Sequence, residues 1–98
     1  MATLFITVWN NASQALLDVP IQYATVTVGA GSLQSDAISG SNKEIRLVRL
    51  FTDTDCFVVW GDDPTAPGDG SGDMPLGAEN PEVVGIKAGQ KIAVIQRI

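Results

Sequence analysis

The sequence contains no histidine and only one cysteine, and these two scarcities exclude several kinds of chemistry. Most acid–base enzymes use histidine near neutral pH, so its absence argues against an enzyme. A single cysteine cannot form an internal disulfide. A chain of 98 residues builds only a thin core. We therefore expect additional stability to come from self-association or from docking onto a larger body.

Basic residues are also scarce, and they are scattered along the chain. Six lysines and arginines stand against eleven acidic residues, for a net charge of −5. A phosphate backbone would meet no basic run, so we expect no nucleic-acid partner. Charged residues make up 17% of the chain, against roughly 25% in typical soluble domains. This composition predicts surface hidden against a partner, or equally well a neutral β surface rich in threonine and serine.

The sequence has no long apolar run. No segment approaches the roughly 18 consecutive apolar residues of a membrane span, so we expect no membrane partner. Residues 1–6 carry no basic region and lead directly into a strand pattern, which is unlike a signal peptide. A free cysteine without a signal peptide is typical of synthesis in a reducing cytoplasm.

Most of the sequence consists of short segments in which apolar and polar residues alternate, separated by turn residues. They predict an all-β fold with seven or eight short strands, arranged as one domain over residues 1–98. We expect a small antiparallel β-sandwich, jelly-roll or Ig-like, with a small barrel as the alternative. The strand patterns cover residues 4–9, 21–28, 44–51, 56–60, 82–87 and 90–97, with a weaker one at 33–38.

Turn residues predict how neighbouring strands are joined. Asp53-Thr54-Asp55 and Ala88-Gly89 each separate two strand patterns by a few residues, which favours two antiparallel hairpins. The apolar phase shifts within residues 44–51, which predicts a bulge near Leu47 and Val48 or burial of both faces. Residues 61–75 do not alternate and form an acidic loop rich in glycine and proline.

Few residues suggest chemistry. Cys56 follows Asp55 on a predicted core strand, so we interpret it as a buried structural thiol. The acidic loop offers oxygen ligands for calcium, but the spacing lacks the ordered alternation and distal glutamate of an EF-hand. We therefore expect a solvated loop and predict no catalytic, cofactor-binding or metal-binding residue. The aromatic residues are expected mainly in the core, with Trp60 beside Gly61 as the best candidate for exposure.

The half of the chain from Arg46 onward resembles small structural proteins of tailed bacteriophages. The resemblance rests on RLFTDTDCFVVWGDDPTA at residues 49–66, MPLGA at residues 74–78 and PEVVGIKAGQKIAVI at residues 81–95. It implies a virion component, namely a capsid decoration (cement) protein with a β-sandwich fold. Such a protein binds the major capsid protein at the capsid surface, often as a homotrimer, and is made in the host bacterial cytoplasm. The resemblance supplies no catalytic residues.

Two segments are predicted to contact the partner. The first is an N-terminal arm over residues 1–10, because it is terminal and apolar on both faces, and an extended arm can add to a neighbour's sheet. The second is the acidic loop. The predicted contact residues are Leu4, Phe5, Ile6, Val8, Trp9, Trp60, Asp62, Asp63, Asp69 and Asp73.

Two other functions fit the same sequence. A receptor- or glycan-binding module of a tail or head fibre predicts an exposed aromatic patch around Trp60. A head–tail connector or tail accessory protein predicts ring-shaped oligomers. An enzyme would instead require a deep pocket with perturbed carboxylates.

Overall fold

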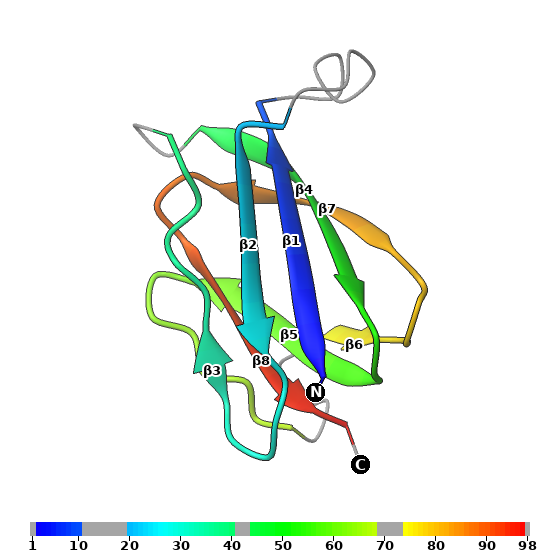
Figure 1. Ribbon diagram of the computed structural model, residues 1–98. Coiled ribbons are helices and arrows are strands. Elements are labelled where there is room, and N and C mark those ends of the chain that lie inside the picture. Colours follow the sequence, from blue (N-terminus) through cyan, green and yellow to red (C-terminus); the bar gives the residue numbers. More distant parts are fainter. Residues whose placement is uncertain (1, 11–19, 41–43, 69–73, 98) are drawn as a thin grey trace.

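The computed structural model describes residues 2–10, 20–40, 44–68 and 74–97, which contain eight β-strands and no helix (Figure 1). The prediction of an all-β fold with seven to eight short strands is confirmed. No helix within these residues is long and apolar enough to cross a membrane. The strands are β1 (Thr3–Trp9), β2 (Gln22–Thr27), β3 (Leu33–Gln34), β4 (Ile45–Thr52), β5 (Cys56–Gly61), β6 (Met74–Leu76), β7 (Glu82–Lys87) and β8 (Lys91–Gln96).

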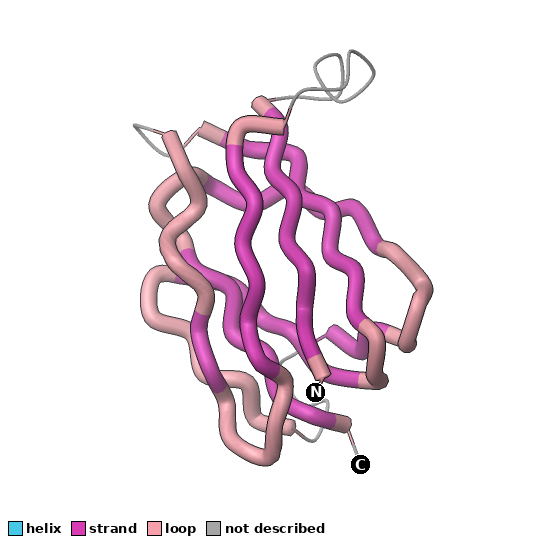
Figure 2. Tube along the Cα trace, in the orientation of Figure 1, coloured by secondary structure: helices cyan, strands magenta, loops and turns pink. Residues whose placement is uncertain are grey.

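The strands form two four-stranded sheets packed face to face, as the traces in Figures 1 and 2 show. Sheet A has the order β2-β1-β4-β7, and sheet B has the order β3-β8-β5-β6. Every pairing is antiparallel. The predicted antiparallel β-sandwich is therefore confirmed.

The pairings are nested in the manner of a jelly roll. β5 pairs with β6, β4 with β7, and β3 with β8, as in one long antiparallel hairpin folded across two sheets. In a complete jelly roll, a further strand after β8 would pair with β2. Here β1 pairs with β2 and occupies that position in sheet A. Of the two sandwich types considered, the strand order corresponds to the jelly roll.

The two predicted hairpins are instead connections between the sheets. β4 lies in sheet A and β5 in sheet B, and β7 and β8 are divided in the same way. Gly89 adopts the positive φ expected of it, at 92°, in a turn that Gln90 N–H closes on Lys87 C=O at 3.1 Å. A short polar turn allows either geometry. Here β4 and β5 face the common core from opposite sheets, as do β7 and β8. The chain therefore crosses from sheet A to sheet B at both turns.

The core fills the space between the sheets. Alternate residues of each strand point inward, and the inward apolar residues of β1 and β4 are buried: Leu4, Ile6, Val8, Val48 and Leu50. Sheet B covers them with Val58, Leu76, Ile92 and Val94. Each such side chain contributes about 1.5–3 kcal/mol by leaving water.

β4 contains no bulge, because its register with β1 and β7 runs without interruption through Leu47 and Val48. The phase shift of its apolar residues has another cause. Val48 and Leu50 face the core, whereas Ile45 and Leu47 occupy the opposite face of the strand. Sheet A therefore carries apolar side chains on the face directed away from the core.

Candidate functional site

The first predicted contact segment is an interior strand rather than an arm. β1 lies between β2 and β4 and is paired with both along its length. Leu4, Ile6 and Val8 are at most 1% exposed. These three side chains belong to the core and are not available to a partner, because sheet B packs over the inward face of β1. Phe5 alone of the predicted contacts in β1 is well exposed.

The second predicted contact segment is the acidic loop, of which the structure describes residues 62–68. Hydrogen bonds hold these residues beside β3. The Gln34 side chain donates hydrogen bonds to Asp63 Oδ1 at 2.8 Å and to Pro64 C=O at 2.7 Å. Ala66 N–H donates to Ser32 Oγ at 2.9 Å, and Pro64 and Ala66 are buried. These hydrogen bonds fix this part of the loop beside β3, while Asp62, Asp63, Thr65 and Pro67 remain exposed.

The acidic residues of this loop give no metal site within the described chain. Asp62 and Asp63 are exposed, and Asp69 and Asp73 lie outside the described residues. Among residues 2–10, 20–40, 44–68 and 74–97, no group of three or more histidine, cysteine, aspartate or glutamate residues could hold a metal ion.

The two tryptophans are not the exposed aromatic residues. Trp60 is half-buried and packs against the core. Trp9 is also half-buried, and its Nε1 is buried without a hydrogen-bond partner among the described residues. The exposed aromatic side chains lie elsewhere: Tyr23 is 73% exposed and Phe5 is 44% exposed.

Both rings lie on the face of sheet A directed away from the core, which we call the outer face. Because side chains alternate along each strand, the inward residues of β1 leave Phe5 on the opposite side, and the strand register places Tyr23 and Phe51 beside it. Ile45 and Val83, 58% and 54% exposed, extend this face toward β7. A cluster of exposed apolar side chains on a small soluble domain marks an interaction surface.

Cross-strand rows organise the outer face. One row runs from Thr25 to Phe5 to Phe51, and the two phenyl rings lie 6.2 Å apart with planes inclined by 48°. In the next row, Arg49 places its guanidinium 5.5 Å from the centre of the Phe51 ring. A shallow hollow of ≈560 Å³ opens between these rows, lined by Phe5, Ile6, Thr7, Tyr23, Ala24, Thr25, Arg49 and Phe51.

The charge of the outer face is opposite to that of the whole chain. On the four strands of sheet A, the outward positions carry Arg49 and Lys87 and no carboxylate. The chain as a whole has a net charge of −5. An apolar, locally positive face on an acidic protein is complementary to an apolar partner surface that bears carboxylates.

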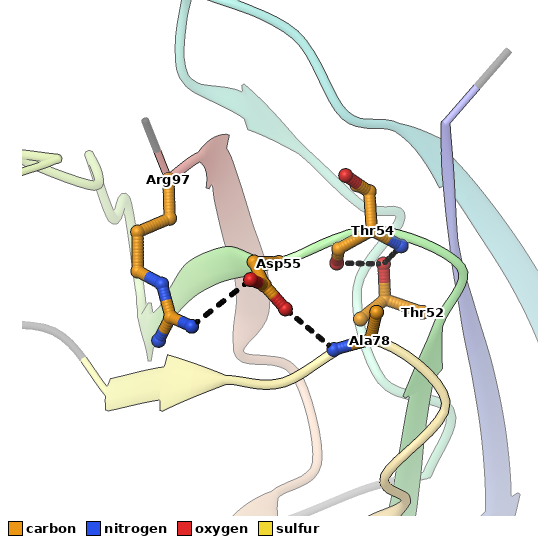
Figure 3. Close-up of polar contacts among 5 residues, drawn as sticks. All are labelled: Thr52, Thr54, Asp55, Ala78 and Arg97. Carbon is orange, nitrogen blue, oxygen red and sulfur yellow. Dashed lines mark hydrogen bonds and ion pairs between the residues drawn. The ribbon is translucent and has the colours of Figure 1, made fainter.

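The most polar cluster of the fold is structural. Asp55, at the corner between β4 and β5, accepts a hydrogen bond from Ala78 N–H at 2.8 Å and pairs with Arg97 at 3.2 Å (Figure 3). The Ala78 hydrogen bond and then the Arg97 guanidinium lower the pKa of this carboxyl. Thr52 Oγ1 bonds to both the N–H and the C=O of Thr54 and folds the corner. All of these groups fasten the chain to itself, and none is directed into a cleft.

Cys56 is buried, as the sequence predicted. Burial raises the pKa of its thiol, partly offset by a hydrogen bond with Thr52. A protonated thiol inside the core has neither the charge nor the access that a nucleophile requires. Cys56 therefore acts as a small apolar core residue.

Sequence reasoning did not identify Tyr23, Arg49, Phe51 and Val83 as surface contacts. The sequence places Tyr23 and Phe51 in the predicted core, because large apolar residues in strands are usually buried. A signal was nevertheless present in the strand pattern of residues 44–51, where apolar residues occupy both faces. One of these faces is the outer face. No protein-family model, no curated protein and no solved structure matches this chain.

Proposed function

We propose that the protein is a non-enzymatic virion structural protein, a capsid decoration protein that binds the major capsid protein through the outer face of sheet A. One observation carries the proposal: an exposed apolar face bearing Arg49 and Lys87 and no carboxylate, on a chain of net charge −5. The resemblance of residues 49–95 to phage structural proteins supports a capsid as the partner.

The outer face has the physical properties of a docking surface. Its side chains stand on the strands of a hydrogen-bonded sheet, so little backbone freedom is lost when a partner binds. Tyr23 and Phe5 are the aromatic residues that project furthest into solvent. Aromatic anchors of this kind often dominate an interface, and losing one costs about 2 kcal/mol or more.

Arg49 gives the docking its chemical preference. Its guanidinium lies against the Phe51 ring, which holds it among apolar side chains. A carboxylate on the partner would pair with Arg49 and be shielded from water by the surrounding rings. An unpaired positive group buried against a basic or purely apolar surface would be costly. The expected partner surface is therefore apolar with acidic residues.

Electron cryomicroscopy of purified phage particles that contain the protein tests this proposal. We expect density for the sandwich on the capsid surface, with sheet A toward the shell and sheet B toward solvent. The same map gives the copy number and symmetry, and so tests the homotrimer that the resemblance implies. Density confined to the tail, or sheet A facing solvent on the head, would contradict the proposal.

A glycan-binding module of a fibre is the second candidate. The observation that favours it is the hollow on the outer face, where Phe5, Tyr23 and Phe51 surround a space of ≈560 Å³. Aromatic faces stack on apolar sugar faces, and Arg49 could bind a sugar carboxylate. Titration with neutral and acidic oligosaccharides distinguishes the two functions: heat of binding that is lost in Tyr23→Ala favours the glycan module.

A further inference from the structure

We propose that the open edge of β7 pairs with β7 of a second copy of this chain. The two copies would be antiparallel and related by a two-fold axis perpendicular to sheet A. Their four-stranded sheets would then join into one sheet of eight strands. This inference does not depend on the identity of the partner that the outer face binds, and its two-fold dimer takes the place of the homotrimer that the resemblance implies.

Among the described residues, β7 is the least protected of the four sheet edges. In sheet B, β3 has two residues and β6 has three, one of which is Pro75, so neither offers a long ladder. In sheet A, residues beside the β2 edge are held to it, because the Gln22 side chain bonds to Ala37 C=O and Ser39 N–H. β7 has six residues, and its interior, residues 83–86, contains no proline and no charge. Soluble proteins normally protect such edges, so an unprotected one indicates a binding partner.

The hydrogen-bond pattern identifies the free backbone groups of β7. Ala88 N–H donates to Glu44 C=O at 2.7 Å, in register with the β4–β7 ladder. Bonded pairs alternate along an antiparallel ladder, so Glu82, Val84 and Ile86 direct their N–H and C=O groups toward β4. Val83 and Gly85 consequently direct both groups toward the open edge, and these are the groups that a second strand would bind.

The strand is complementary to itself when antiparallel. Glu82 stands at its start and Lys87 at its end, so two antiparallel copies place opposite charges at each end of the junction, Lys87 on the outer face and Glu82 on the other face of the sheet. We place Val83 of one copy opposite Gly85 of the other, where both residues offer free backbone groups. Gly85 has no side chain to obstruct that position, and the neighbouring side chain on the outer face is Ile45.

This pairing accounts for two exposed apolar side chains. Val83 and Ile45 are among the most exposed large apolar residues of the described chain, and the second copy would cover both at the junction. A two-fold axis perpendicular to the sheet leaves both outer faces on the same side. The dimer would therefore present one continuous face, twice the size of that of a single chain.

Analytical ultracentrifugation of the purified chain tests the pairing, over a concentration range of about 1 to 500 µM. We expect a reversible equilibrium between the 10.3 kDa chain and a species of twice that mass. Val83→Pro removes an N–H that faces the open edge and leaves every hydrogen bond to β4 in place. Proline is tolerated at such an edge position. This variant should weaken dimerisation at least tenfold. The matched control Val83→Thr keeps the N–H and should weaken dimerisation less.

Val83→Lys provides an independent variant, because it places a charge at the edge without changing the backbone. It should also weaken dimerisation at least tenfold, whether or not Val83→Pro folds. Three results would overturn the inference. These are a wild-type chain that is monomeric at every concentration, a trimer in place of the dimer, and folded Val83→Lys that dimerises as strongly as wild type.

Discussion

The carboxylate of Asp55 lies 3.2 Å from the guanidinium of Arg97 and so joins the β4–β5 corner to the residue that follows β8. The other oxygen of Asp55 accepts a hydrogen bond from Ala78 N–H, in the connection between β6 and β7. Asp53, two residues earlier, accepts one from Thr3 N–H at 2.8 Å. One short corner thus holds the start of β1, the β6–β7 connection and the end of β8.

The Asp55 contacts make stability depend on pH. The Ala78 hydrogen bond and the Arg97 charge lower the pKa of Asp55 in the folded chain. A carboxyl with a lowered folded pKa stabilises the fold fully above its unfolded pKa of about 3.9, and this contribution is lost as the pH falls further. We therefore expect Asp55→Asn to reduce the loss of Tm between pH 5 and pH 3, measured by circular dichroism. Asp36→Asn, which changes an exposed carboxylate outside this cluster, is the control and should retain the wild-type pH dependence.

The packed core predicts a large effect for a single truncation. Leu50 is fully buried at the centre of β4, so Leu50→Ala leaves a cavity and should lower the free energy of unfolding by about 2–5 kcal/mol. Leu33→Ala removes a comparable side chain that is 48% exposed and should cost within about 0.5 kcal/mol. Urea denaturation measures both values. Similar losses for the two variants would contradict the assignment of the core.

Deletion of residues 2–9 tests the position of β1. The sequence alone predicts an N-terminal arm over residues 1–10 that can add to a neighbour's sheet. In the structure, the deletion removes the strand between β2 and β4, together with Leu4, Ile6 and Val8. We expect the truncated chain to show no cooperative thermal transition. A truncated chain that melts cooperatively would mean that β1 is dispensable.

Cys56 should be inert in the folded protein. Burial raises the pKa of its thiol, which leaves it protonated at neutral pH and shielded from reagents. Addition of a chromogenic disulfide reagent at pH 7.5 should give almost no signal in buffer and about one equivalent of thiol in denaturant. Rapid reaction of the native protein would show that β5 opens or that Cys56 is accessible.

The fold class was predictable because alternation along strands follows directly from which face is buried. Strand connections were harder to predict. The turn at Asp53-Thr54-Asp55 is short and polar, and such a turn suits a hairpin as well as a crossing between sheets. The crossing is determined by packing, since Leu50 before the turn and Val58 after it must meet the same core from opposite layers.

The outer face was obscured for a related reason. In a strand, Phe51 and Tyr23 look the same in sequence whether they face a core or a partner, because both environments favour large apolar side chains. Only the burial of the alternate residues, such as Leu50 and Val26, shows which face is already occupied. The outward residues of the same strands then form the outer face, which a partner can cover.

The central proposal is that the outer face of sheet A binds a phage capsid, and co-sedimentation of the purified chain with phage capsids tests it most directly. Tyr23→Ala removes the most exposed ring, and Arg49→Glu reverses the charge over the Phe51 ring. Each should weaken binding about 30-fold, the equivalent of roughly 2 kcal/mol. Leu33→Ala, an exposed change on sheet B, should bind as wild type does. If Tyr23→Ala and Arg49→Glu remain folded and co-sediment as strongly as wild type, the outer face is not the docking surface.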